Sequence, residues 1–355
     1  MEKKYRFDKD FISAKILEAT KQLQDENIKE DTKMHLEYMI QRLDEYLKGT
    51  SSGKETSFDK DFTELENKLK DDTSTEKYNF LIQTSLLLEE IDKTILEEKN
   101  YQFIKLSEEK MMDLILDFYE SIDNEYYHKA MQIIQCPTSV INLEEGSNIY
   151  SNCLIVPELI APLIHVREKG DYKYGALVHE VQHGIDYLIH RFNIVRIYKE
   201  LAPLFFETLF YDRLNVINEC EGLYCDRVID QVIMLNRIKQ YTEILKRFNK
   251  HKQKITKRNI YKILNVKNDI ELEKKYKFWM EFDVNEYLCF IFSYFKCLEI
   301  RNIYYNDDRK KALEKLKKCV TGENVELDFN NLIRCYNEWV SELKEKQKGY
   351  QKTVK

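Results

Sequence analysis

The sequence is poor in glycine and proline, the residues that most often mark turns. It contains 9 glycines and 4 prolines in 355 residues, too few for a fold of many short strands. No run approaches the roughly 20 apolar residues of a membrane span, and the first residues, MEKKYRFDKDF, lack the apolar core of a signal peptide. We therefore expect a mainly α-helical, cytoplasmic protein that has no membrane partner.

A strong excess of one charge is also missing. The 56 Lys and Arg and 62 Asp and Glu residues give a net charge of -6 and are interspersed along the chain. No basic face therefore predicts nucleic-acid binding. The chain has 8 cysteines but no export signal, which favours reduced thiols over disulfides. A hydrophobic content of 43% is ample for a buried core.

Helical periodicity organises the first part of the chain. Apolar residues recur at helical spacing in residues 36–47, and the same pattern predicts helices near 58–70, 74–98 and 107–125. We interpret residues 1–130 as a helical N-terminal subdomain.

One β-prone stretch, residues 137–157, interrupts the helical pattern. Its two runs, SVINL and NIYSNCLIV, flank the turn-like EEGSN, which predicts a hairpin or a small sheet. Helices are expected again at about 172–191 and 194–214. Further helices are expected within 226–348, and a tail at 349–355. We interpret residues 131–348 as one domain that contains the small sheet and these helices.

The motif HEVQH carries the clearest chemical signal. His179 and His183 are four residues apart, so on a helix both rings project from one face and can reach the same metal ion. Glu180 lies about 100° further round the helix, where HExxH sites hold the general base. Apolar neighbours indicate that this helix is buried, where histidines are costly unless they are paired or ligated. The motif predicts one Zn²⁺ per chain.

A third protein ligand has to come from another segment. Glu200 and Glu207, in ELAPLFFE, are seven residues apart and share a helix face. If the first helix ends near residue 190 and the chain turns back tightly, Glu200 lies level with His183. Glu207 would require the first helix to continue to about residue 194. We favour Glu200 as the ligand and Glu207 as a supporting carboxylate.

Two further polar residues follow the motif on the same predicted helix. Asp186, three residues after His183, is a candidate to hold a ligand imidazole through its other N–H. His190 faces the same side but lies about 10 Å further along the axis. We expect His190 to line a cleft and not to bind the metal.

Together, HEVQH and ELAPLFFE resemble the gluzincin peptidases of the thimet oligopeptidase and oligoendopeptidase F family. The resemblance implies a zincin-like, mainly α fold with His179, His183 and Glu200 as zinc ligands, Glu180 as base and Glu207 as support. It extends more loosely through the stretch from EYLCF to NNLI, residues 286–333. There Tyr287, with Tyr294 as the next candidate, matches the tyrosine that stabilises the oxyanion in this family.

These features predict a zinc-dependent metallopeptidase that cleaves short or unfolded peptides. Glu180 would activate a zinc-bound water, and an extended peptide substrate would pair with the NIYSNCLIV strand. One alternative is a zinc-dependent toxin or effector protease with a specific protein target. Another is a non-catalytic helical protein that binds zinc or a partner, and a third is a metal-free helical domain. The sequence does not predict an oligomeric state.

Overall fold

The computed structural model describes residues 9–25, 62–73, 108–135, 141–145, 152–154, 163–168, 173–190, 194–195, 198–216 and 223–323, with isolated residues between 33 and 85 and between 334 and 341. These residues are mainly helical and include one three-stranded sheet, so the predicted fold class is confirmed. None of the helices in this described part is both long enough and apolar enough to cross a membrane.

The chain divides into two compact units, each built from segments that are not contiguous in sequence. The first unit comprises Met1–Gly53, Tyr101–Tyr224 and Glu299–Glu326. The second comprises Lys54–Asn100, Cys225–Leu298 and Leu327–Lys355. The expected subdomain boundary at residue 130 falls inside a helix of the first unit. Most of the helix expected at 74–98, and the tail at 349–355, lie outside the described residues.

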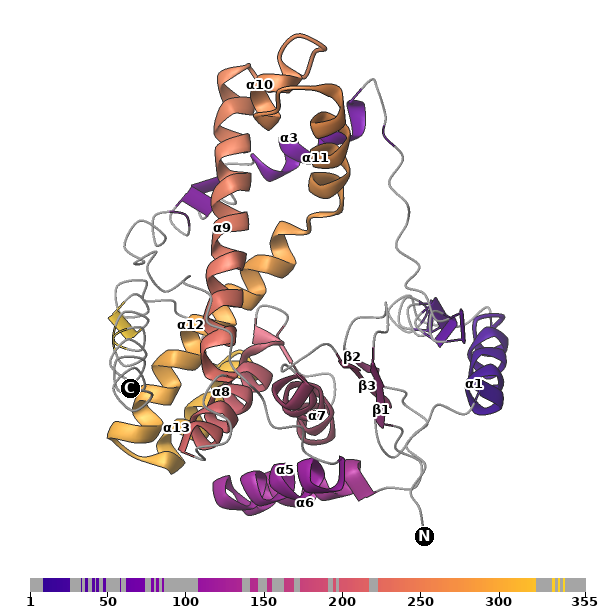
Figure 1. Cartoon of the computed structure of the whole chain (residues 1–355). Helices are drawn as coiled ribbons and strands as arrows, with labels where there is room; N and C mark the ends of the chain where they lie inside the picture. The colour runs from indigo at the N-terminus through magenta and orange to yellow at the C-terminus, as the bar shows by residue number, and fades with distance from the viewer. Residues whose placement is uncertain are drawn as a thin grey trace, which may run out of the picture. The chain divides into compact units, whose positions relative to one another are not determined.

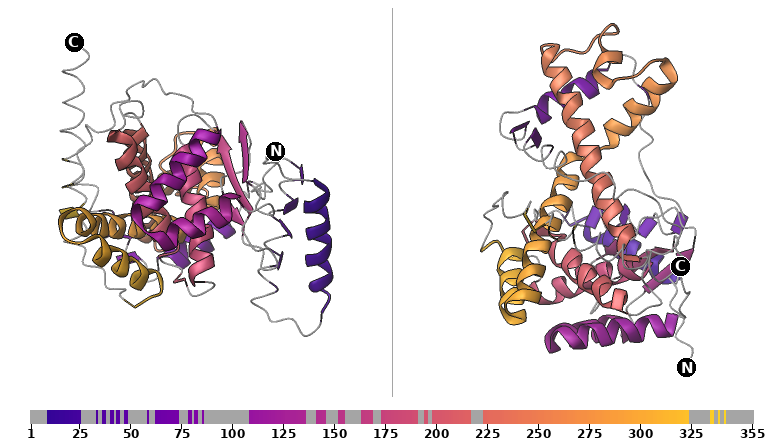
Figure 2. Two further views of the ribbon diagram at one scale, coloured as in Figure 1. Left: turned by 90° about the horizontal axis from the view of Figure 1, so that it is seen from below. Right: turned by 60° about the vertical axis from the view of Figure 1, so that its left-hand side comes forward.

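The first unit is built around two neighbouring helices, α7 and α8 (Figure 1). Helices α5 and α6 lie across one side of this pair (Figures 1 and 2). Asp123 separates α5 from α6, and its carboxylate accepts a hydrogen bond from the Glu125 backbone N–H, so one helix ends where the next is capped. The helices of this unit are α1 (Lys9–Gln22), α5 (Glu108–Ile122), α6 (Asn124–Gln135), α7 (Lys173–His190), α8 (Leu201–Val216) and α13 (Arg309–Val320).

Helix α8 lies in the core of the first unit, since every side chain from Leu201 to Tyr211 is buried. Phe206 contacts the rings of Phe118 and Tyr119 on α5 and of Tyr126 on α6. A helix that is buried all round is held by neighbours on several sides, which fixes its polar side chains in place as well.

Gly175 on α7 permits α7 and α8 to approach closely. A Cβ atom at this position would lie 1.9 Å from Tyr211 Oη and 2.3 Å from Tyr211 Cζ. The Tyr211 side chain is itself buried. The absence of a side chain at Gly175 therefore sets the spacing of the two helices one turn before His179.

The sheet pairs its strands in the order β1 (Ile141–Glu145), β3 (Leu163–Glu168), β2 (Asn152–Leu154). Strands β1 and β3 are parallel, with Ile141 opposite Ile164, and β2 is antiparallel to β3. The predicted β-prone runs therefore contain strands, but a direct hairpin between them is wrong because β3 lies between them. Ile164 and Val166 of β3 are fully buried, and the sheet packs against α7.

The second unit contains α9, α10, α11 and most of α12, with α3 beside α11 (Figure 1). Its core is aromatic, and the rings of Tyr241, Trp279 and Phe282 are in mutual contact. The Tyr241 hydroxyl donates to the buried Asp72 carboxylate, which connects α9 to α3. The bounds are α3 (Thr63–Asp72), α9 (Leu223–Lys250), α10 (Ile260–Leu264), α11 (Asp269–Glu281) and α12 (Val284–Asn306).

Candidate metal centre

Helix α7 presents the HEVQH motif on a buried helix, as the sequence predicted. Leu177, Val178, Val181 and Ile185 are fully buried around it. His179 and His183 are one turn apart, with ring centroids 4.9 Å from each other. The apolar residues fix the helix, and the two imidazoles consequently face the same side.

The third group of the cluster is Glu200. Its Oε2 lies 3.1 Å from His179 Nε2 and 3.3 Å from His183 Nε2. One donor atom from each of the three residues lies within 4.8 Å of the others. The structure thus brings together the two histidines and the glutamate that the sequence favoured.

Glu200 does not lie within helix α8 but immediately before it. The predicted helix at 194–214 begins at Leu201 instead, and the Glu200 carbonyl accepts the first backbone bond, from Leu204 N–H, at 3.0 Å. Pro203 explains this start, because a proline lacks the N–H that a helix interior needs and is tolerated in the first turn. The Glu200 carboxylate therefore lies at the positive end of the α8 dipole.

Glu207 lies on α8, seven residues after Glu200 and so on the same face, and it contacts the other side of the His179 ring. Its Oε2 lies 3.0 Å from His179 Nδ1. Burial alone would lower the pKa of His179, but the hydrogen bonds to Glu200 and Glu207 raise it to about 10. The Nδ1 contact orients the ring so that Nε2 points at Glu200 and His183.

Charge in this cluster is dominated by carboxylates. Glu180, Glu200 and Glu207 are between 4% and 7% exposed. Burial raises the pKa of Glu180. Burial would also raise the pKa of Glu200, but the neighbouring His183 and His179 hold it well below its usual value. Lys199, whose Nζ lies 3.7 Å from Glu200 Oε1, is the cation closest in sequence to this group.

Asp186 has a different place from the one expected. It was a candidate to hold a ligand imidazole, but its Oδ1 accepts a hydrogen bond of 2.7 Å from Gln182 Nε2. Burial raises the pKa of Asp186 to about 7. Gln182 was missed in the sequence, although its i,i+4 spacing to Asp186 is the pattern of a helical side-chain pair. Glu207 takes the position beside the imidazole instead.

The remaining sequence candidates lie elsewhere. Tyr287 and Tyr294 belong to the second unit, where the Tyr287 hydroxyl accepts a hydrogen bond of 2.6 Å from Arg237 Nη1. The expected role of these tyrosines in binding an oxyanion stays a prediction. His190 ends α7 outside the three-residue group, and burial, together with Lys317, lowers its pKa.

The donor set fits a zinc ion. Two imidazole nitrogens and one carboxylate oxygen are a common set for catalytic zinc, which leaves one position for water or substrate. Ligand atoms at tetrahedral angles and zinc distances lie about 3.3 Å apart, close to the separations of 3.1 and 3.3 Å found here. His179, His183 and Glu200 could therefore hold a metal ion.

Comparisons with known proteins assign no family. No family model matches the sequence, and no curated protein matches it. One solved structure that is similar is that of a candidate oligoendopeptidase F from Bacillus anthracis str. Ames, with 11% sequence identity and a TM-score of 0.48. The match covers 89% of this chain and 63% of that chain. These values are too low to transfer residue roles, so the function has to follow from the geometry of the site.

Proposed function

We propose that the protein is a zinc-dependent metallopeptidase that hydrolyses peptide bonds in short or unfolded peptides. The observation that carries the proposal is the convergence of His179 Nε2, His183 Nε2 and Glu200 Oε2, with the buried Glu180 on the same helix turn. Two imidazoles, one carboxylate and an adjacent second carboxylate are the groups that a hydrolytic zinc centre needs.

The chain's own residues divide the work. His179, His183 and Glu200 would hold the zinc ion, which supplies Lewis-acid polarisation of a carbonyl and makes water more acidic. Glu180 would accept the proton of the attacking water and deliver it to the amine nitrogen as the C–N bond breaks. Glu207 would keep the His179 ring in the tautomer whose Nε2 lone pair faces the metal.

Strand β2 is the proposed binding edge for an extended peptide. It lies at one edge of the sheet and pairs with β3, the one partner it has among the described strands. This strand packs against α7, the helix that carries Glu180. Burial, with the nearby charges of Glu180 and Asp186, raises the pKa of Cys153 on β2. A peptide that adds to such an edge uses its main chain, which suits unfolded segments of varied sequence. Tyr287 remains the proposed oxyanion donor on the basis of the sequence resemblance alone.

The test combines metal content with cleavage. Purified protein is expected to bind about one equivalent of zinc, measured by atomic emission, and to cleave a mixed peptide library, read by mass spectrometry. Glu180→Gln is expected to keep the zinc and lower the cleavage rate by about 10²- to 10⁴-fold. Glu125→Gln on α6, an exposed glutamate that pairs with Lys317, is the matched control and should cleave normally.

Three results would overturn the proposal. Cleavage that is unchanged in Glu180→Gln would remove the assigned base. Stoichiometric zinc with no cleavage of any peptide or folded protein would indicate a non-catalytic zinc module. Cleavage of one folded partner with no cleavage of the library would indicate an effector protease with a specific target.

A further inference from the structure

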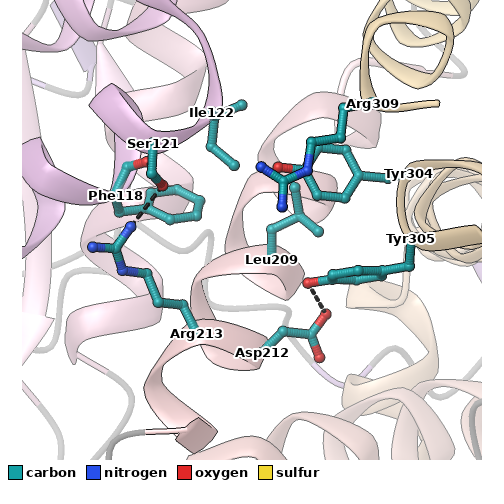
Figure 3. A pocket seen from close by; sticks show the side chains of 9 residues that line it. All are labelled: Phe118, Ser121, Ile122, Leu209, Asp212, Arg213, Tyr304, Tyr305 and Arg309. Carbon is teal, nitrogen blue, oxygen red and sulfur yellow. Dashed lines mark hydrogen bonds between the residues drawn. The ribbon is translucent and has the colours of Figure 1, made fainter.

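A second candidate site lies on α8, in a pocket that the metal cluster does not use (Figure 3). The pocket has a volume of about 530 Å³ and opens between α5, α8, the end of α12 and the start of α13, all within the first unit. This volume suits a small organic molecule. The lining residues are Phe118, Ser121, Ile122, Leu209, Asp212, Arg213, Tyr304, Tyr305 and Arg309.

The pocket and the metal cluster occupy different faces of α8. At about 100° per residue, Leu209, Asp212 and Arg213 point between roughly 140° and 240° away from Glu207. Glu200 and Glu207 share the face toward α7. A ligand in the pocket therefore does not replace any group of the metal centre.

The floor of the pocket is formed by buried, largely apolar side chains. Phe118, Leu209 and Tyr304 are between 1% and 6% exposed. Phe118 also packs edge-on against Phe206 and Phe210 of α8. Such a floor offers a flat, preformed surface on which an aromatic or aliphatic group can lie.

The one carboxylate that lines the pocket is already neutralised. Asp212 accepts two hydrogen bonds from Arg301, of 2.7 Å from Nε and 3.0 Å from Nη2. The Tyr305 hydroxyl donates a third bond of 3.1 Å (Figure 3). Asp212 is thus held by its own partners and adds little net negative charge to the pocket.

Two arginines on opposite sides of the pocket have no such carboxylate partner among the described residues (Figure 3). Arg213 Nη1 donates to Ser121 Oγ at 2.6 Å and to the Asp117 carbonyl at 3.3 Å, both neutral acceptors. The Arg309 guanidinium lies 5.2 Å from the centre of the Tyr304 ring. No carboxylate of the described residues therefore neutralises either guanidinium group above the apolar floor.

We propose that this pocket binds an anionic organic molecule. Its oxyanion head, a carboxylate or a phosphate, would lie between Arg213 and Arg309, and its apolar body would lie on Phe118, Leu209 and Tyr304. Guanidinium groups match both head groups because their N–H donors form a planar fork. A purely structural role for the two arginines explains the Ser121 and Tyr304 contacts, but not why both line the same open pocket.

Direct binding to the full chain tests the proposal without any need for catalysis. Isothermal titration calorimetry would use 3-phenylpropanoate and phenyl phosphate as probes. The neutral analogue is 3-phenylpropanamide, and acetate and inorganic phosphate are the corresponding anions without an aromatic group. At least one aromatic anion is expected to bind about tenfold or more tightly than the amide. It should also bind more tightly than its bare head, and the preferred head distinguishes a carboxylate from a phosphate ligand.

Variants locate the binding. Arg309→Gln and Arg213→Gln are each expected to weaken the preferred probe by about tenfold or more, with unchanged circular dichroism. Lys310→Gln is the matched control because it removes the same charge from the next residue of α13, which does not line the pocket. It should change binding by less than about twofold, since an exposed charge outside the pocket is screened by salt.

Arg309 is exposed, so its replacement keeps the proposal testable even if Arg213→Gln unfolds. Equal affinity for the amide and the anions would overturn the proposal. So would the absence of binding by either aromatic anion, or an equal loss in Lys310→Gln and Arg309→Gln.

Discussion

The two faces of helix α8 carry charged groups of opposite sign. The face toward α7 holds Glu200 and Glu207, which approach the imidazoles of the metal cluster. The other face holds Arg213, beside a pocket that Arg309 also lines from the start of α13. Helix α8 therefore separates a region rich in carboxylates from a region rich in guanidinium groups.

The ion pair between Asp212 on α8 and Arg301 is an example of charges that neutralise each other within the protein. It forms two hydrogen bonds in a mostly buried setting and needs no ligand. The metal cluster instead gathers three buried carboxylates around two imidazoles, and the pocket holds two guanidinium groups whose printed partners are neutral. Burial makes an excess of carboxylate costly unless a cation offsets it, whereas the guanidinium groups, of which Arg309 is exposed, are accessible to an anion from solvent. The sign of each excess therefore indicates the ligand: a cation on the first face and an anion on the second.

The largest expected effect comes from loss of a metal ligand. His183→Ala removes one of three protein donors and should lower zinc affinity by more than about 100-fold, the upper limit for removal of an outer-sphere partner. Competition with a chelator of known affinity, read by atomic emission, measures the loss. Binding of 3-phenylpropanoate or phenyl phosphate should stay within about twofold, because the pocket lies on the other face of α8.

The reciprocal variant completes this test. Arg309→Gln should weaken the anionic probe and leave zinc affinity within about twofold, since the two sites share no side chain. If either variant weakens both ligands, the two faces of α8 are not independent and the comparison fails.

A smaller loss of zinc affinity is expected from Glu207→Gln. This change keeps an acceptor beside His179 Nδ1 but removes the negative charge that strengthens the ligand nitrogen. We expect affinity to fall by about tenfold, measured by the same chelator competition. Asp186→Asn is the control, because Asp186 bonds to Gln182 and not to an imidazole, and it should change affinity by less than about threefold. An equal loss in both variants would contradict the role given to Glu207.

Gly175→Ala tests whether the spacing of α7 and α8 affects zinc binding on one face of α8 more than anion binding on the other. The new Cβ would overlap the buried Tyr211 ring, and such overpacking costs about 1–3 kcal/mol. We expect a melting temperature several degrees lower and weaker zinc binding, with anion binding little changed. Tyr211→Leu in the Gly175→Ala background removes the overlapping atoms and should restore part of the loss. No recovery would mean that the destabilisation has another cause.

The group of His179, His183 and Glu200 could be predicted because its determinants are local in sequence. Helical spacing puts the two histidines on one face, and the helix end at His190 fixes where the returning chain comes level with His183. Pro203 also indicated that α8 starts near Leu201, a signal that the predicted helix at 194–214 did not use.

Features that depend on long-range packing were not predictable in this way. Strand β3 entered between β1 and β2 because its buried Ile164 and Val166 pack in the core beside α7, and no turn signal encodes this order. The arginine pocket joins residues 118 and 309, which are close only after α5, α8 and α13 have packed. Single-sequence periodicity gives the face of each helix but not its neighbours.

The smallest expected effect concerns Lys199, the cation beside the acidic face. Its Nζ lies 3.7 Å from Glu200 Oε1, and its side chain is 36% exposed.

The variant Lys199→Met removes a positive charge that repels a bound cation, but it also removes a partner of Glu200. Because Lys199 is partly exposed, solvent screens its pairing with the buried Glu200, which we expect to contribute about 1 kcal/mol. The start of α8 fixes the Glu200 backbone independently. We therefore expect zinc affinity to rise by about two- to threefold at low ionic strength. The gain should disappear at 1 M salt, where the Debye length is about 3 Å. Lys199→Arg keeps the charge and should leave the affinity unchanged. A fall in affinity in Lys199→Met would mean that this lysine positions the glutamate, and that the acidic face of α8 is partly balanced by its own cation.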